Sequence, residues 1–321
     1  MSLVVNAFAL AVVISNAGNL WSFARNVIYK LFPFSYTDRL KHVEWVMVTG
    51  ATDGVGLEMA RELAKAGKGV VVVGRNPRKL AKVKQWFDDN KYSNYRIVRM
   101  DLSDIDFLHA YEAKWKDQLK DLPKIDMIVN NAGVIEFNDM TAVDYHNAEV
   151  LLSTNTLSAI VVTNEYLKSL KGHSRSACNV VFISSGSVFL KYGYLGHYAY
   201  SKHIGSSYFR YIHRKISKAE AQIQTTILHL GSVVTKLNVI CKDLYTSSGS
   251  QVKEVKLFGT VTAKEAARSI LWQSVGELES HGPVIHYIYH ASVSDVLVHE
   301  VGKLFSAKVI NHLKAKQHCN P

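Results

Sequence analysis

A tyrosine and a lysine stand four residues apart in the stretch YAYSKHIGSSYF, at Tyr198 and Lys202. In a helix, residues at this spacing lie on one face, one turn apart. A free phenol has a pKa of about 10, but a neighbouring ammonium stabilises the phenolate and lowers that pKa. The pair could therefore donate a proton to an oxygen that gains negative charge. The same spacing recurs at Tyr211 and Lys215, so on its own it also fits a polar helix surface.

A glycine-rich turn, TGATDGVG at 49–56, follows an apolar run and leads directly into a helical pattern. Backbone N–H groups and the helix dipole favour an anion at such a helix start, and glycine lets a pyrophosphate come close. Tight turns need glycine anyway, but the strand before and the helix after are the context that a dinucleotide site requires. The residues expected at the nucleotide are Gly50, Thr52, Asp53, Gly54, Val55 and Gly56.

The stretch VVVVGRNPRK, at 70–79, bears on the choice between NAD and NADP. A site for NAD usually offers an acid to the ribose hydroxyls, whereas a site for NADP offers a cation to the 2′-phosphate. Gly74 stands where the acid would be, Arg75 follows, and Arg78 and Lys79 are close behind. An arginine can bind a phosphate bidentately, although a merely basic loop would have the same composition. We predict NADPH or NADP+ as the cofactor.

Strand-like and helix-like segments must position these residues, and they alternate from residue 43 onward. Strands are expected at 43–50, 69–75, 95–102, 125–133, 180–185, 223–230 and 283–290. Helices are expected at 55–67, 77–90, 105–119, 143–170, 198–219 and 262–275. This alternation predicts an α/β fold, a doubly wound parallel sheet (Rossmann fold) of about seven strands with helices on both faces. Such sheets bind ligands beyond the carboxyl ends of their strands.

The chain divides into three regions on its patterning. Residues 1–40 contain an N-terminal hydrophobic segment, and residues 41–290 form the predicted NADP-binding catalytic domain. Residues 291–321 form a C-terminal helix and tail. The apolar spacing of that helix favours packing on the core over a second membrane contact.

Residues 1–24 contain no charged side chain, and this length is sufficient for a helix to span a bilayer. Asparagines and serines dilute the segment, so a helix lying on the membrane or packed on the domain is the alternative. Basic residues follow the segment and none precede it. We expect this segment to be a membrane anchor, and the endoplasmic reticulum to be the membrane. The positive-inside rule then places the catalytic domain on the cytosolic side. A cleaved signal peptide fits less well, because no basic region precedes the apolar one.

The overall composition excludes several kinds of partner. The net charge is +11, but no run of lysine and arginine resembles a nucleic-acid arm, and no zinc-finger or RNA-recognition pattern occurs. Cys178, Cys241 and Cys319 are far apart and form no CxxC, so neither a disulfide framework nor a metal site is predicted. Assembly into a homo-oligomer is compatible with this composition.

Six motifs together resemble the short-chain dehydrogenase/reductase family over roughly residues 43–290. They are the glycine turn, DLSD at 101–104, NNAG at 130–133, Asn155 in NTLSAI, ISSGS at 183–187 and YAYSK at 198–202. The glycine turn together with ISSGS also looks like the membrane-bound branch that reduces 3-oxoacyl-CoA and 17-ketosteroids.

The resemblance implies an active-site tetrad of Asn155, Ser185, Tyr198 and Lys202. Ser185 precedes Tyr198 by 13 residues, the spacing typical of the family, whereas no serine stands 13 residues before Tyr211. A ketone that accepts a hydride at carbon would receive its proton from Tyr198. Lys202 would lower the pKa of the phenol and bind the nicotinamide ribose, and Ser185 would hold the carbonyl oxygen.

Three of these assignments compete with simpler explanations. Asn155 is expected to position a water that relays protons toward the lysine, but it could merely bond to backbone within its helix. Ser185 could cap a strand end, and its neighbours Ser184 and Ser187 are disfavoured only by spacing.

The resemblance also implies further nucleotide contacts. One departure from the family lies after the sixth strand, where Leu230 precedes Gly231 in place of the usual proline. Without proline the φ angle of this loop is less restricted. The further contacts expected are Asp101 near the adenine, Asn131 and Gly133 along the nucleotide, and Val233 and Thr235 around the nicotinamide.

The sequence says least about the identity of the substrate. Residues 236–261 contain no usable motif, although in this family such a segment closes over the substrate. The expected anchor favours a small-molecule lipophilic carbonyl substrate. The resemblance to the membrane-bound branch implies a 3-oxoacyl-CoA or a steroid-like ketone, with retinoid or ketosphinganine reduction as alternatives. A rival function is that of a nucleotide-binding scaffold without turnover, but the complete tetrad argues against it.

Overall fold

The computed structural model describes residues 35–104, 121–136, 144–170, 178–189, 196–219, 223–231, 233–235, 261–274 and 284–288. Within these ranges, no helix is long and apolar enough to cross a membrane. The anchor expected at 1–24, the helix expected at 105–119, the substrate segment at 236–260 and the C-terminal region at 291–321 lie outside them.

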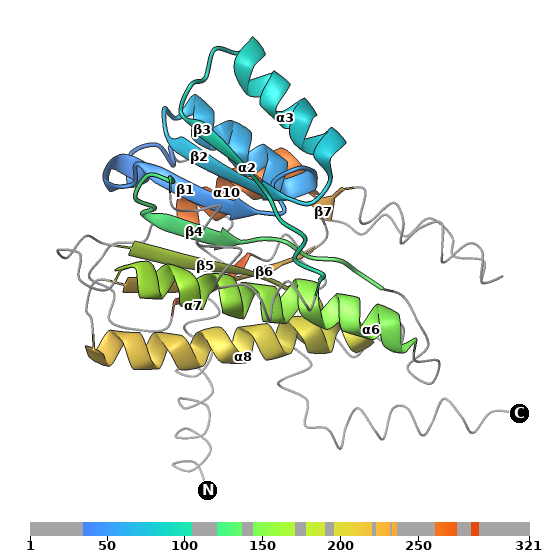
Figure 1. Ribbon diagram of the computed structural model, residues 1–321. Coiled ribbons are helices and arrows are strands. Elements are labelled where there is room, and N and C mark those ends of the chain that lie inside the picture. Colours follow the sequence, from blue (N-terminus) through green and yellow to red (C-terminus); the bar gives the residue numbers. More distant parts are fainter. Residues whose placement is uncertain are drawn as a thin grey trace, which may run out of the picture.

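Seven parallel strands form one sheet in the order β3-β2-β1-β4-β5-β6-β9 (Figure 1). They are β1 (Trp45–Thr49), β2 (Gly69–Gly74), β3 (Tyr95–Arg99), β4 (Met127–Asn130), β5 (Cys178–Ser185), β6 (Ile223–Leu230) and β9 (Val284–Ile288). The chain starts at the centre of the sheet, builds outward to β3, then crosses back to β4 and continues to the other edge. This is a doubly wound sheet, and it confirms the fold class predicted from the sequence.

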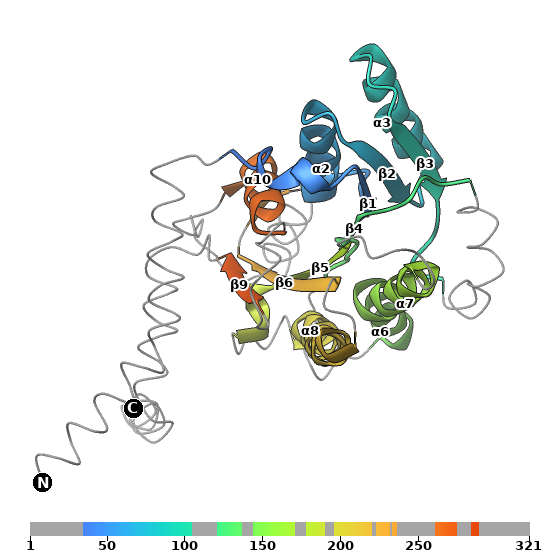
Figure 2. The ribbon, with the colours of Figure 1, turned by 90° about the vertical axis from the view of Figure 1, so that its left-hand side faces the viewer.

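Helices cover both faces of the sheet (Figure 2). One face carries α2 (Gly54–Lys65), α3 (Pro77–Asp89) and α10 (Ala263–Ser274). The other carries α6 (Tyr145–Leu152), α7 (Ser158–Leu170) and α8 (Gly196–Ala219). Short 3-10 helices occupy Arg39–His42 (η1) and Gly186–Phe189 (η3), and a π-helical turn, η2, occupies Ser153–Leu157.

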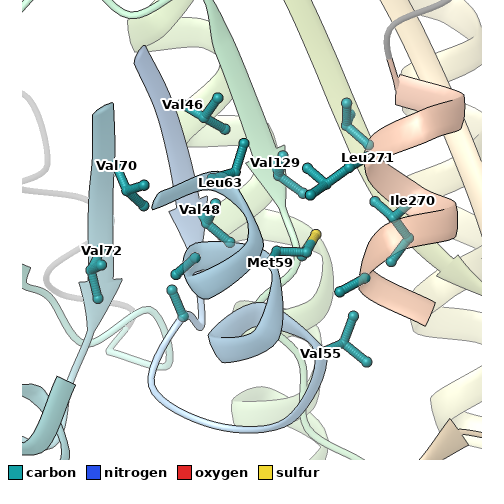
Figure 3. Close-up of a cluster of buried hydrophobic side chains, with 14 of the residues drawn as sticks. Val46, Val48, Val55, Met59, Leu63, Val70, Val72, Val129, Ile270 and Leu271 are labelled. Carbon is teal, nitrogen blue, oxygen red and sulfur yellow. The ribbon is translucent and has the colours of Figure 1, made fainter. Parts of the chain in front are cut away.

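The apolar patterns explain why the sheet is buried on both sides. All six residues of β2 are buried, as a Val-rich central parallel strand requires. In α2 the apolar residues recur at helical spacing, and Figure 3 shows Met59 and Leu63 directed into the space between the sheet and α10. Ile270 and Leu271 of α10 complete this cluster and are fully buried. The packing fixes α2, and with it the glycine turn at its start.

The strands that carry the site end at the same edge because their starts are tied together. The carboxylate of Asp126 accepts hydrogen bonds from the backbone N–H groups of Glu44 at 2.8 Å and Trp45 at 3.0 Å. This places the start of β4 against the start of β1, with Val46 opposite Met127. The carboxyl ends of β1 and β4 therefore lie side by side, where the topology reverses.

The chain just before β1 is packed on the domain. Leu40 is fully buried, and the hydroxyl of Tyr36 donates to the Glu62 carboxylate of α2 at 2.9 Å. Arg268 of α10 donates to the same carboxylate at 2.7 Å. Burial alone would raise the pKa of Glu62, but the bonds from Arg268, Tyr36 and Lys65 outweigh it and hold that pKa below its usual value. Residues 36–43 are therefore packed against α2 and α10.

A small two-stranded sheet was not predicted from the sequence. Val233–Val234 (β7) pairs in parallel with Val261–Thr262 (β8), directly before α10. A strand of two residues is too short to show any alternation. The pairing holds the segment after β6 near the start of α10.

Candidate active site

The glycine turn has the close approaches that the sequence predicts for it. Gly50 has a φ of +65°, and a Cβ there would lie 2.8 Å from the backbone Cα of Ala132. A Cβ on Gly56 would lie 2.5 Å from the Asn131 side chain and equally close to the carbonyl oxygen of Gly50. Any side chain at these two positions would force the backbone apart. The turn between β1 and α2 therefore presents bare backbone, which suits a phosphate-binding loop.

Thr49 and Asn131 fasten this turn to the end of β4. The Thr49 hydroxyl accepts from the backbone N–H groups of Asn131 and Ala132, both at 3.0 Å. The Asn131 amide in turn donates to the Thr49 carbonyl at 2.9 Å. The expected nucleotide residue Asn131 thus supports the turn through its side chain. Thr49 was not among the predicted site residues, because the residues that bond to it are 82 and 83 positions away in the chain.

Asp53 lies in the turn with its charge paired. Its side chain accepts from the backbone N–H of Gly54 at 2.9 Å, and so caps the start of α2. Lys79 of α3 donates to the other carboxylate oxygen at 2.7 Å. A bare carboxylate would repel a phosphate, and the ammonium of Lys79 offsets that charge at the turn.

Arg75 follows the end of β2 and reaches toward the segment after β3. Its guanidinium donates to the hydroxyl of Ser103 at 2.8 Å and lies 3.4 Å from the carboxylate of Asp101. Burial tends to raise the pKa of Asp101, but the bonds from Ser103 and the charge of Arg75 lower it. A Cβ on Gly74 would lie 2.5 Å from the Thr52 methyl. The position where an NAD site would carry its acid therefore has no room for a side chain.

The segment after β6 returns to the glycine turn. A Cβ on Gly54 would lie 3.3 Å from the Thr235 methyl, so the two residues are neighbours. Val233 is buried in the cluster under α2 and α10. Leu230, which departs from the family pattern, is the last residue of β6 and pairs with Ser185. The structure thus brings Val233 and Thr235 to the same side as the turn.

Ser185 ends β5 and is oriented by a residue that the sequence offered only as a competitor. The backbone N–H and the hydroxyl of Ser187 both donate to the Ser185 oxygen, at 3.2 and 2.9 Å. Because Ser185 accepts twice, its own hydroxyl proton is left to donate to a third group. The other competitor, Ser184, is buried and bonds to Ser206 of α8 at 2.8 Å. Of the three serines, Ser185 suits a carbonyl oxygen best.

His229 lies beside Ser185 and adds no positive charge at neutral pH. It pairs with Ser184 across β5 and β6, is 2% exposed, and holds Nδ1 3.4 Å from the Ser185 carbonyl oxygen. Burial lowers the pKa of this imidazole to about 4. His229 was not among the predicted site residues, since one histidine in an apolar strand carries no motif.

Lys202 is the buried cation of the site. Its side chain is 3% exposed and donates to the backbone carbonyl of Ile183 at 3.0 Å. Burial lowers the pKa of this ammonium to about 8. The group is therefore mostly charged at neutral pH, in a setting where its charge is weakly screened. That is the setting in which an ammonium stabilises a phenolate on the same helix.

Asn155 lies in the π-helical turn η2 and is fully buried. Its side-chain oxygen accepts from the backbone N–H of Val134 at 2.8 Å, and its amide donates to the Val134 carbonyl at 2.9 Å. The second amide proton goes to the hydroxyl of Ser201 at 2.9 Å. Single π-helical turns inside α-helices are frequent at functional sites. Here the turn directs Asn155 at the segment after β4.

Gly133 brings Asn155 and Lys202 together. A Cβ on this exposed glycine would lie 3.2 Å from the side-chain oxygen of Asn155 and 3.2 Å from the ammonium of Lys202. Even an alanine at this position would require these two groups to shift by a few tenths of an ångström. The surface above Gly133 is thus open to a ligand, with a cation and an amide directly beneath it.

Tyr198 lies one turn before Lys202 on α8 and is only partly exposed. By contrast, Tyr211 of the second tyrosine–lysine pair is 57% exposed, on the outer surface of the same helix. Tyr198 shares a helix turn with Lys202, which is bonded to the end of β5. The two tyrosines therefore differ in exposure although each has a lysine at the same spacing.

Together these residues fit a bound dinucleotide. The glycine turn offers bare backbone at a helix start, Thr235 lies over it, and Gly133 and Lys202 lie farther along the same edge of the sheet. Arg75 extends from the next strand outward. A long ligand could therefore lie across the carboxyl ends of the strands, with one end near Arg75 and the other near Ser185 and Tyr198.

The chain is similar in sequence to known dehydrogenases and reductases, and similar in fold to solved structures of dehydrogenases. Dehydrogenase/reductase SDR family member 7B of Xenopus laevis is 26% identical over 257 residues, 78% of this chain and 76% of that protein. The very-long-chain 3-oxoacyl-CoA reductase of Homo sapiens is 30% identical over 203 residues, 62% of each chain. The closed form of serine dehydrogenase complexed with NADP+ shares the fold, with a TM-score of 0.59 at 21% identity, covering 76% of this chain and 92% of that one.

The sequence model of one family, described as short chain dehydrogenase, matches residues 44–243. This match covers more than half of the chain and includes the glycine turn and all four residues of the tetrad. The chain therefore belongs to the short-chain dehydrogenase/reductase family of oxidoreductases, which use a nicotinamide cofactor.

Proposed function

We propose that this protein is an NADPH-dependent oxidoreductase that transfers a hydride between nicotinamide and a lipophilic ketone or alcohol. The proposal rests on one observation above others: Lys202 is buried one turn from Tyr198 and beside Gly133, and no carboxylate of the described residues pairs with it. A buried ammonium is costly, and such groups cluster at functional sites. Oxidation of NADPH by the purified full chain, with a panel of 3-oxoacyl-CoA thioesters and 17-ketosteroids, tests the proposal.

The mechanism uses the three polar groups at the ends of β5 and α8. When bound, NADPH supplies the hydride that the carbonyl carbon accepts. Ser185 donates a hydrogen bond to the carbonyl oxygen and holds it, since Ser187 already fills its acceptor positions. Tyr198 donates its phenolic proton to the same oxygen as negative charge develops there. Lys202 stabilises the resulting phenolate, and Asn155 keeps the segment at Val134 in place.

The preference for NADPH rests on the end of β2. Gly74 leaves no space for an acid, and Arg75 is the nearest cation beyond it. The Arg75 guanidinium is 55% exposed, so a phosphate could reach it. Asp101 and Ser103 hold the arginine from one side and limit its movement, which lowers the entropy that a phosphate contact would cost.

Replacing Arg75 with aspartate should therefore change the cofactor. We expect the wild-type protein to bind NADPH more tightly than NADH, and Arg75→Asp to flatten or reverse that preference. Fluorescence titration with each nucleotide measures the change. Arg96→Asp on β3, another exposed arginine, is the matched control and should leave the preference unchanged. Equal affinity of the wild type for both nucleotides would contradict the assignment.

The substrate class rests on relatives and on the N-terminal segment. The human relative is described as acting on very-long-chain 3-oxoacyl-CoA, and the uncharged residues 1–24 suit a protein that meets its substrate at a membrane. We propose a 3-oxoacyl-CoA or a steroid-like ketone as the substrate.

We also propose that residues 1–24 anchor the protein in the endoplasmic reticulum, with the catalytic domain on the cytosolic side. The charge asymmetry around this segment supports that orientation. Protease added to intact microsomes should digest the catalytic domain, whereas protection until detergent is added would contradict the orientation. Deleting residues 1–24 should release the protein from the membrane fraction, and continued binding would contradict the anchor.

A further inference from the structure

Ser201 lies between Tyr198 and Lys202 on α8. It is hydrogen-bonded to the π-helical turn through both its side chain and its backbone carbonyl. Its side chain is fully buried. Its hydroxyl accepts from the Asn155 amide at 2.9 Å, and its backbone carbonyl accepts from the Thr156 hydroxyl at 2.7 Å. Two consecutive residues of the turn, Asn155 and Thr156, therefore both donate hydrogen bonds to one residue of the neighbouring helix.

The hydroxyl proton of Ser201 is also used. It donates to the backbone carbonyl of Tyr198, three residues earlier, at 2.7 Å. A serine has a single proton, so with this bond made it can only accept from Asn155. That requirement fixes which end of the Asn155 side chain carries the NH₂ group. It follows that the oxygen of Asn155 faces Val134 and the space above Gly133.

The position of this link matters because of its neighbours. Ser201 directly precedes Lys202 and lies less than one turn after Tyr198. The hydrogen bonds at Ser201 therefore fix both the rotation of α8 about its axis and its translation along that axis, relative to the π-helical turn. Catalytic groups tolerate little misplacement, and about 1 Å can cost a hundredfold in rate.

We infer that Ser201 is a positioning residue that locks the π-helical turn to α8, and thereby places Lys202 and Tyr198 at the end of β5. The inference rests on the proposed function for its effect on turnover. Its effect on NADPH binding rests only on the placement of Lys202 beside Gly133.

Ser206 provides a matched control on the same helix. It is also fully buried, its hydroxyl also donates to a backbone carbonyl one turn earlier, and it also has a second partner, Ser184. Ser201→Ala and Ser206→Ala therefore remove the same kind of internal bond. Only the first breaks the link to Asn155.

The experiment compares full-length variants in NADPH titrations and in turnover of the ketone that the wild type reduces fastest. Ser201→Ala should lower kcat by roughly tenfold or more with little change in KM for the ketone, and should weaken NADPH binding several-fold. Ser201→Thr keeps the hydroxyl and should restore most of both. Ser206→Ala should lower the melting temperature by a similar amount without either loss. If Ser201→Ala does not fold, Ser201→Cys replaces it, because a thiol is a weak donor and acceptor.

A double variant shows whether Ser201 affects activity through its hydrogen bond to Asn155 or only through its bond within α8. If Ser201 acts through Asn155, Ser201→Ala should cost little further activity in an Asn155→Ala background. Equal losses in the Ser201 and Ser206 variants, or full additivity with Asn155→Ala, would overturn the inference. If no ketone is reduced by the wild type, the proposed function fails, and the NADPH titrations alone decide the inference.

Discussion

Tyr198→Phe should lower turnover by about 10² to 10⁴-fold, and by more if the tetrad acts as a unit, while NADPH binding survives. The variant removes the only proton donor assigned to the carbonyl oxygen but keeps the ring and its packing on α8. Steady-state kinetics with NADPH and the reduced ketone measure the loss, and fluorescence titration measures the binding. A fall in kcat without a rise in the Kd for NADPH is the expected pattern.

The second tyrosine–lysine pair on α8 is the control. Tyr211 is 57% exposed, and Tyr211→Phe and Lys215→Met should change neither turnover nor binding appreciably. If the Tyr211 variant lost activity and the Tyr198 variant kept it, the assignment of Tyr198 would be wrong. The assignment of Ser185, which depends on its spacing from Tyr198, would be lost with it.

Lys202→Met should lose activity and NADPH affinity together, and should nevertheless make the folded protein more stable at pH 7. The lysine is assigned two tasks, to stabilise the phenolate and to bind the ribose, so both readouts should fall. Its ammonium is also buried, which lowers its pKa to about 8 against about 10.5 in the unfolded chain. The shift corresponds to roughly 3 kcal/mol, and the lost bond to Ile183 offsets about 1 kcal/mol of the gain.

The stability that Lys202→Met gains over the wild type should depend on pH, because it arises from the lowered pKa of Lys202. Between about pH 8 and pH 10.5 the unfolded chain binds a proton at residue 202 that the folded chain has released. Wild-type stability therefore rises relative to Lys202→Met as pH increases through this window. The difference in melting temperature, measured without nucleotide, should be largest at pH 7 and fall to zero at about pH 10, where the lost bond to Ile183 balances what is left of the burial cost. A variant that is less stable than the wild type at pH 7 would contradict a buried, charged Lys202.

The architecture could be predicted from the sequence because each of its signals is local. β2 is a run of valines bounded by glycines, and its six residues are all buried in the structure. The glycine turn could be recognised because the strand before it and the helix after it are adjacent in the chain. The end of α8, at Ala219, and the bounds of β6 also agree with the predicted ranges.

What the sequence did not show depends on contacts that form only in the folded chain. Ser187 could be read only as a competitor of Ser185, because its role lies in donating to that residue within the folded turn. Asp53 was expected at the nucleotide, and its pairing with Lys79 joins two elements that no periodicity connects. Likewise, the π-helical turn at Asn155 has no composition of its own, since it is stabilised by bonds to Val134 and Ser201.

Transfer of deuterium from NADPH labelled at C4 of the nicotinamide tests the proposed activity most directly. The purified full chain would be incubated with the labelled cofactor and with a 3-oxoacyl-CoA or a 17-ketosteroid, and the product analysed by mass spectrometry. Using cofactor labelled on each face of the ring in turn, we expect deuterium on the carbinol carbon of the product from one of the two, and none with Tyr198→Phe. Tight binding of NADPH without label transfer to any ketone of the panel would contradict the proposed activity and identify a nucleotide-binding scaffold.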